Sequence, residues 1–204
     1  MIHQISELYN QQMETVCRGI ADAFTDYPWS EGNLGMCEYL DREHFYRFVR
    51  GYIEAAVRNG SLYSAGENGE AYMILETPET KNTLAGSLIQ LKWMLRGYGV
   101  KNAVRQIKEI VADGDYLSPE FKKRKQPFVK IELIVVMKAY QHQGYMRQMM
   151  EFAFAEADKR RAPCILTTDD IKKVQMYEHY GMKMVKKHHL KGEIYYFEML
   201  RDAH

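Results

Sequence analysis

The 204-residue sequence predicts one domain of the α/β or α+β class, in which helices flank a central sheet and an extra helical insertion interrupts it. Three observations predict this class. Apolar residues recur at helical spacing in two segments near the N-terminus, a strand-like hairpin follows them, and the C-terminal half alternates strand, helix, strand, helix and two closing strands. Since 46% of the residues are hydrophobic, the chain can bury a sizeable core.

Two helices are expected before the first strands. The first covers residues 6–25, and its apolar face consists of Leu8, Met13, Val16, Ile20 and Phe24. The second covers residues 36–58 and ends before an Asn-Gly pair, a common helix C-terminus. The segment between them contains proline and glycine, which predict a loop, and it carries Tyr27 and Trp29.

A β-hairpin and a helical insertion are expected next. The segment SLYSAGENGEAYMIL, residues 61–75, has two apolar strands around a turn from Gly66 to Gly69. Residues 81–112 predict two helices with a bend near Gly97 and Gly99. Because strand-like sequence lies on both sides, residues 76–118 are interpreted as an insertion or lid over the core.

The C-terminal part contains the clearest elements. Residues 128–137 form the best strand candidate, because they are rich in β-branched residues and follow Pro127. After Gly144, one helix face is formed by Met146, Met149, Met150, Ala153 and Ala157. The short strand CILTT comes next, then a helix with Asp170 as its N-cap, and finally the strands MKMVKKHHL and EIYYFEML.

Composition argues against several classes of partner. The formal net charge is +1, so nothing global favours nucleic acid or an anionic membrane. The basic cluster from Lys122 to Lys125 is interpreted as a solvated loop, with a nucleic-acid patch or phosphate contact as the alternative. Apolar runs are too short to span a bilayer, and the N-terminus is too polar for a signal peptide. Three widely spaced cysteines give no disulfide framework or metal pattern, so a reducing cytoplasm and no metal are expected.

The stretch AYQHQGYMRQMM, residues 139–150, links the best strand to a helix through a polar turn. The first four N–H groups of a helix lack intrahelical partners, and with the helix dipole they attract anions. Glycine lets the backbone approach a phosphate closely, so Gly144 and Arg147 together fit a pyrophosphate. An ordinary turn with no ligand is the alternative.

Two motifs extend this interpretation. Gln141, His142, Gln143, Gly144, Tyr145 and Met146 match a pattern of Arg or Gln, two residues, Gly, one residue, then Gly or Ala, except that Met146 replaces the small residue. Downstream, DIKKVQMYEHYGM contains a Tyr-Glu-x-x-Gly signature. Residues 128–200 therefore resemble the acyl-CoA-binding core of the GNAT superfamily, the acyl-CoA-dependent N-acyltransferases.

The resemblance implies a mixed, mostly antiparallel sheet and acetyl-CoA as co-substrate, without a metal. It places the cofactor against the motif and its neighbours: Val135, Val136, Gln141, His142, Gln143, Gly144, Tyr145, Met146, Arg147 and Asp170. Asp170 stands where the family usually has asparagine. Tyr27 and Trp29 are implied to lie near the acceptor.

The resemblance also implies two catalytic residues. Glu132, on the strand before the turn, would act as general base, directly or through water; the alternative is a carboxylate that faces solvent or pairs with Lys130. Tyr177 would protonate the departing thiolate; the alternative is a core tyrosine.

His188 and His189 are adjacent in a predicted strand, so their rings point to opposite faces and cannot share a metal ion.

The sequence thus predicts an N-acetyltransferase that acts on a primary amine of a small molecule or peptide in a ternary complex. A non-catalytic acyl-CoA-binding regulatory module of the same fold is the alternative. A homodimer is compatible with the sequence, and no nucleic-acid or membrane partner is expected.

Overall fold

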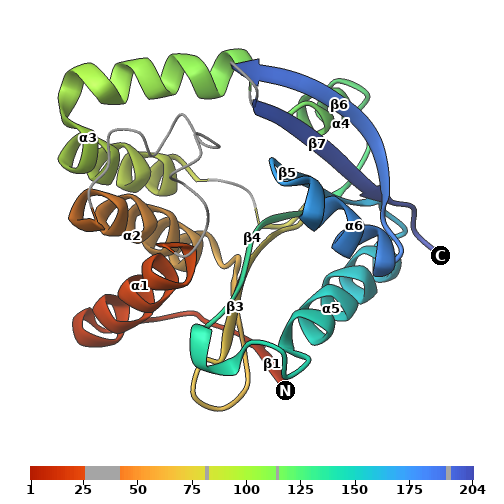
Figure 1. Cartoon of the computed structure of the whole chain (residues 1–204), viewed down its shortest axis with the longest axis horizontal. Coiled ribbons are helices and arrows are strands. Elements are labelled where there is room, and N and C mark those ends of the chain that lie inside the picture. The colour runs from red at the N-terminus through yellow and green to blue at the C-terminus, as the bar shows by residue number, and fades with distance from the viewer. Residues whose placement is uncertain (26–41, 81–82, 114, 192–193) are drawn as a thin grey trace.

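A seven-stranded mixed sheet forms the centre of the molecule (Figure 1). The computed structural model describes residues 1–25, 42–80, 83–113, 115–191 and 194–204. The strands lie in the order β1-β2-β3-β4-β5-β7-β6, and among the described pairs β4 and β5 alone run parallel. They are β1 (Ile2–Gln4), β2 (Leu62–Ala65), β3 (Ala71–Glu76), β4 (Val129–Val136), β5 (Cys164–Thr168), β6 (Lys183–Lys191) and β7 (Ile194–Arg201). The expected mostly antiparallel sheet is confirmed.

Helices cover both faces of the sheet (Figure 1). Helices α1 and α2 pack on one face, and α5 and α6 pack on the other. The helices are α1 (Asn10–Thr25), α2 (Arg42–Asn59), α3 (Leu84–Asp113), α4 (Leu117–Lys123), α5 (Tyr145–Lys159) and α6 (Ile171–His179), with a 3₁₀ turn η2 (Lys138–Tyr140). None of the described helices combines the length and the apolar character needed to cross a membrane.

Two hydrophobic cores result, and β3 contributes to both. Ala71, Met73 and Leu75 point into the core under α5 and α6, whereas Tyr72 and Ile74 point into the core under α1 and α2. Successive strand residues alternate between faces, so a strand covered on both sides becomes almost continuously apolar. This explains the run AYMIL, which begins at Ala71.

Helix α3 lies between β3 and β4 in the chain and packs against α2. Its backbone bends at Gly99, where φ is 68° and ψ is 165°, so the expected bend between two helical segments is confirmed. Gly51 of α2 faces Trp93 of α3, and a Cβ at Gly51 would lie 2.8 Å from the Trp93 Cβ. The missing side chain therefore allows the two helices to approach closely.

Three expectations differ from the structure. Strand β1 was not predicted, because it has only three residues and no apolar alternation. Helix α1 begins at Asn10, later than the apolar pattern suggested. The basic cluster from Lys122 to Lys125 begins in the last turn of helix α4, which ends at Lys123, and only its second half lies in a turn outside the helix; its side chains are solvent-exposed as expected.

The contact at Gly51 gives a stability prediction. Gly51→Ala should lower the free energy of unfolding by about 1–3 kcal/mol, because overpacking against Trp93 outweighs the better helix propensity of alanine. Gly19→Ala is the matched control, since its new Cβ would meet only the flexible end of Met137. Urea denaturation measures both variants, and equal stabilities would show that the α2–α3 contact tolerates a methyl group.

Candidate active site

Strands β4 and β5 separate early, and this separation defines the site. Their described pairing is confined to Val129 with Cys164 and Lys130 with Ile165. Beyond Lys130, β4 continues to pair with β3 as far as Val136, but not with β5. The β5-facing edge of β4 is therefore open over its C-terminal part.

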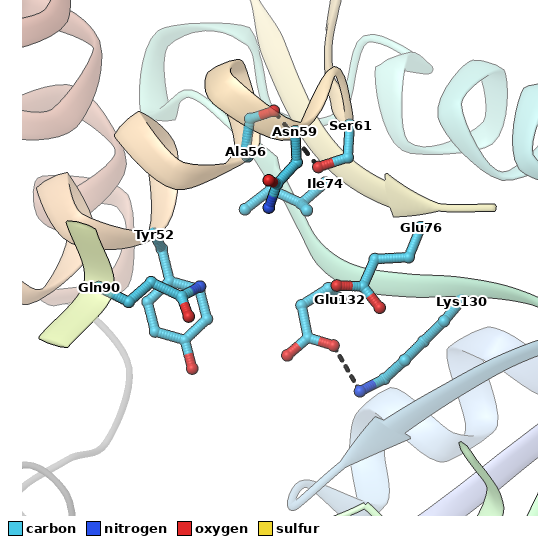
Figure 2. A pocket seen from close by; sticks show the side chains of 9 residues that line it. All are labelled: Tyr52, Ala56, Asn59, Ser61, Ile74, Glu76, Gln90, Lys130 and Glu132. Carbon is cyan, nitrogen blue, oxygen red and sulfur yellow. Dashed lines mark hydrogen bonds and ion pairs between the residues drawn. The ribbon is translucent and has the colours of Figure 1, made fainter. Parts of the chain in front are cut away.

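A pocket opens on the α1–α2 face of the sheet next to this separation (Figure 2). Its cavity volume is about 180 Å³, which is small compared with the roughly 300–1,000 Å³ of pockets for drug-sized ligands. Helices α2 and α3 form one side, and strands β3 and β4 form the other. The lining residues are Tyr52, Ala56, Asn59, Ser61, Ile74, Glu76, Gln90, Lys130 and Glu132.

A β-bulge directs Glu132 into the pocket. Leu75 pairs with Ile131 and Ile74 pairs with Leu133, so Glu132 has no opposite residue on β3. Ordinary alternation would turn adjacent residues to opposite faces. Here Glu132 lines the pocket and Leu133 packs into the core on the same side. Re-aiming a side chain in this way is a common consequence of a bulge.

Lys130 is the cation of this region. Its ammonium group forms ion pairs with Glu132 and, at 2.8 Å, with Asp115 (Figure 2 shows the Glu132 pair). Burial alone would lower the pKa of Lys130, but Glu132 and Asp115 outweigh it and raise that pKa. Burial likewise opposes ionisation of Asp115, yet Lys130 and a hydrogen bond from the Ser118 N–H hold its pKa below the usual range. The pairing of Glu132 with Lys130 was one of the expected alternatives.

Sequence reasoning missed three residues that contribute to this site. Glu76 continues the face of β3 that carries Tyr72 and Ile74, so strand alternation could have placed it there. Tyr52 lies within the predicted helix over residues 36–58, and nothing local set it apart from the other residues of that helix. Asp115 lies at the α3–α4 junction, and its distance in sequence from Lys130 left no local signal.

The predicted elbow is present and open. Gly144 is the N-cap of α5 in the left-handed conformation, with φ of 86° and no side-chain capping bond. Neither backbone nor side-chain atoms lie within 4 Å of the position that a Cβ would take there. Gln141 and Gln143 donate to the carbonyls of Val136 and Ala139 at 3.5 and 3.1 Å. His142 is exposed and also has a positive φ, of 62°.

The side chains after Gly144 leave this turn accessible. Tyr145 and Met146 pack against the core under α5, so the larger residue at position 146 is directed toward the sheet. Arg147 is exposed, and its guanidinium lies 5.8 Å from the Tyr180 ring centroid. The start of α5 thus offers backbone N–H groups with one nearby cation.

Comparison with known proteins identifies the family. The family model of the acetyltransferase (GNAT) family matches residues 5–182. The chain is a member of the GNAT acetyltransferase family. The search of curated proteins finds no match for it.

Solved structures share the fold of this acetyltransferase at low sequence identity. The histone acetyltransferase HPA2 and related acetyltransferase from Corynebacterium glutamicum has a TM-score of 0.63 and 9% identity, covering 100% of this chain and 96% of that one. A polyamine N-acetyltransferase from Drosophila melanogaster has a TM-score of 0.60 and 8% identity, and the match covers 99% of each chain. The NatC complex bound to Gag peptide and CoA has a TM-score of 0.52 and 11% identity, and the match covers 100% of this chain and 98% of that one.

Asp170 and Tyr177, which the sequence also predicted as site residues, both belong to helix α6 or its N-cap. Asp170 caps α6, accepting from the Lys172 N–H at 2.8 Å, as expected. Tyr177 is 6% exposed in the core under α5 and α6, on the face opposite to Glu132. Burial, followed by Asp169 and Asp170, raises the pKa of Tyr177.

Val135 and Val136 are buried at the open end of β4, one in each core. Tyr27 and Trp29 lie outside the described residues. His188 lies 3.8 Å from Glu198, whereas His189 contacts the Tyr195 ring, so the two imidazoles have separate surroundings.

Lys130 provides a test of the site's electrostatics. Lys130→Met should destabilise the protein by about 3–5 kcal/mol at neutral pH, because it leaves two partly buried carboxylates unpaired. The loss should shrink as the pH falls and those carboxylates become protonated. Thermal unfolding between pH 4.5 and 8 measures this difference from wild type. A pH-independent loss would instead point to packing of the lysine stem.

Proposed function

We propose that this protein transfers the acetyl group of acetyl-CoA to a primary amine of a small molecule or peptide, by direct attack in a ternary complex. The observation that carries the proposal is an acidic pocket next to the point where β4 leaves β5. Family membership supports acetyl transfer. Among the structural neighbours, one is named for polyamines and another for a bound peptide and CoA.

The cofactor is proposed to bind along the C-terminal end of β4. The diphosphate would rest on the first N–H groups of α5, with Gly144 allowing close approach and Arg147 adding positive charge. Gln141, His142, Gln143, Tyr145, Met146 and Asp170 complete the proposed surroundings. The free edge of β4 near Val135 and Val136 would polarise the thioester carbonyl through backbone N–H groups.

The acceptor is proposed to enter the pocket as an ammonium ion. Ordinary alkyl amines resemble lysine, with a pKa of about 10.4, and they must lose a proton before attacking a thioester. A carboxylate that lines the pocket, such as Glu132, is proposed to act on that proton directly or through water. The carboxylates of the pocket would attract the cation before any chemistry occurs.

The leaving thiolate is proposed to take its proton from Tyr177. Glu132 and Tyr177 lie on opposite faces of the sheet, so a thioester between β4 and β5 would face one on each side. Burial raises the pKa of Tyr177, so the phenol is protonated at neutral pH. Positioning can lower a barrier by about 7–11 kcal/mol, whereas one acid or base supplies about 3–5 kcal/mol, so positioning should dominate.

The proposed setting is the cytoplasm. Cys17 and Cys164 are both buried free thiols, which fits a reducing compartment. Burial raises the pKa of each thiol to about 12, so neither is suited to act as a thiolate nucleophile.

A panel of amines tests the function. With acetyl-CoA, the protein should release free CoA thiol in the presence of at least one primary amine, and mass spectrometry should detect the N-acetyl product. Tertiary amines of matched size are the control, because they cannot form a stable amide. Binding of acetyl-CoA without turnover on any monoamine, polyamine or peptide would favour the regulatory-module alternative.

The elbow is tested by Gly144→Glu. This variant should lose measurable acetyl-CoA binding by calorimetry, because a carboxylate would repel the diphosphate and a side chain would occupy its approach. Gly181→Glu is the matched control: Gly181 also has a positive φ, of 98°, and open space around it, but it follows the C-terminus of α6. Normal affinity in Gly144→Glu would refute the proposed diphosphate site.

A further inference from the structure

We propose that Glu76 is a second catalytic carboxylate: it receives the proton of the acceptor ammonium, while Glu132, paired with Lys130, orients the amine. This inference rests on the proposed function. It adds a residue of β3 that neither of the two sequence motifs includes.

Both carboxylates face the same pocket. Glu76 is the cross-strand neighbour of Lys130, and the bulge brings Glu132 to the same face of the sheet. Figure 2 shows the Glu76 and Glu132 side chains reaching into the pocket from adjacent strands. An ammonium group has three N–H donors, so it can contact two neighbouring carboxylates at once.

Glu76 and Glu132 differ in the ion-pair and hydrogen-bond partners that their carboxylates have. Glu132 forms an ion pair with Lys130, and Lys130 is also held by Asp115. Within the described part of the chain, the Glu76 carboxylate forms no hydrogen bond or ion pair. Glu76 therefore has both oxygens available for an incoming donor, whereas Glu132 shares its charge with a resident cation.

Their surroundings also divide the chemical roles. Burial, followed by the charge of Glu132, raises the pKa of Glu76. A general base works best when its pKa approaches the working pH, and pairs of carboxylates in unlike environments often divide acid–base roles. Protonation of Glu76 relieves both its desolvation and its repulsion from Glu132, so the proton is better placed there.

The step balances within the proposed ternary complex. The N–H bond of the ammonium breaks and its proton forms an O–H bond on Glu76. The freed nitrogen lone pair forms the C–N bond to the thioester carbonyl carbon. The carbonyl re-forms as the C–S bond breaks, and the thiolate takes a proton from Tyr177 on the opposite face. The nitrogen loses its second proton as the amide forms, and that proton restores the Tyr177 phenol through solvent. Solvent at the open mouth of the pocket removes the proton from Glu76 before the next turnover.

The raised pKa of Glu76 also affects stability, and this effect distinguishes a catalytic role of Glu76 from a structural one. A carboxyl whose folded pKa lies above its unfolded value favours the fold while it is protonated, and this contribution is lost as the pH rises through the folded pKa. At neutral pH the ionised Glu76 therefore opposes folding. Glu76→Gln should leave the melting temperature equal to or above that of wild type, even though activity falls.

The role of Glu76 is tested by comparing the pH profiles of kcat/KM for wild type and Glu76→Gln, with an amine from the panel. Wild type should level off above the pKa of Glu76, because the enzyme deprotonates the bound ammonium. Glu76→Gln should instead rise about tenfold per pH unit toward the amine pKa, because only free amine reacts. At pH 7 its kcat/KM should be lower by about 100-fold or more, with unchanged acetyl-CoA affinity.

Two further variants serve as controls. Glu132→Gln should raise KM for the amine yet keep measurable activity and the levelled profile. Glu79 lies outside the pocket and forms an ion pair with Arg160. Glu79→Gln should therefore have the same kcat/KM profile and the same acetyl-CoA affinity as wild type. If Glu76→Gln fails to fold, Glu76→Asp replaces it and should show a reduced rate with a levelled but shifted profile.

The outcomes separate the two proposals. A wild-type profile and rate in Glu76→Gln, with turnover intact, would overturn the role of Glu76 alone. A levelled profile that disappears only in Glu132→Gln would assign the proton to Glu132 and also overturn it. Absence of turnover in wild type, despite acetyl-CoA binding, would overturn the proposed function itself.

Discussion

The short pairing of β4 and β5 is the constraint on which the site depends. Two parallel strands that stay paired satisfy each other's backbone groups and leave no room between them. Here the ladder ends at Lys130, and each strand then leads to its own helix. Because the strands are parallel, the N-termini of α5 and α6 open at the same edge of the sheet, at Gly144 and Asp170. The proposed diphosphate site and the acidic pocket thus share one strand.

Lys130 ties this separation to the charge of the pocket. It is the last residue of β4 that pairs with β5, and its ammonium group forms ion pairs with both Asp115 and Glu132. Asp115 belongs to the junction between α3 and α4, so the ion pairs fasten the end of the helical insertion to the sheet. Among the residues that line the pocket, one cation, Lys130, stands against two carboxylates, Glu76 and Glu132. In the proposed function, that imbalance would attract a positively charged acceptor.

Local sequence patterns predicted the elements of the fold more readily than the pocket. The β-branched run of β4, the Asp170 cap and the open turn at Gly144 each depend on a few neighbouring residues, so periodicity and turn chemistry indicate them. The pocket instead combines α2, α3, β3 and β4, and no local pattern joins Tyr52 to Glu76. The bulge at Glu132 depends on the register with β3, which a single strand does not encode.

In the proposed mechanism, the acidic excess of the pocket would also favour release of the product. The acceptor would arrive as an ammonium ion attracted by both carboxylates, whereas the amide product carries no charge on that nitrogen. With the proton on Glu76, the repulsion between Glu76 and Glu132 would be relieved, and no ion pair would hold the product. Loss of that proton to solvent would restore the Glu76 carboxylate and with it the attraction for the next ammonium ion.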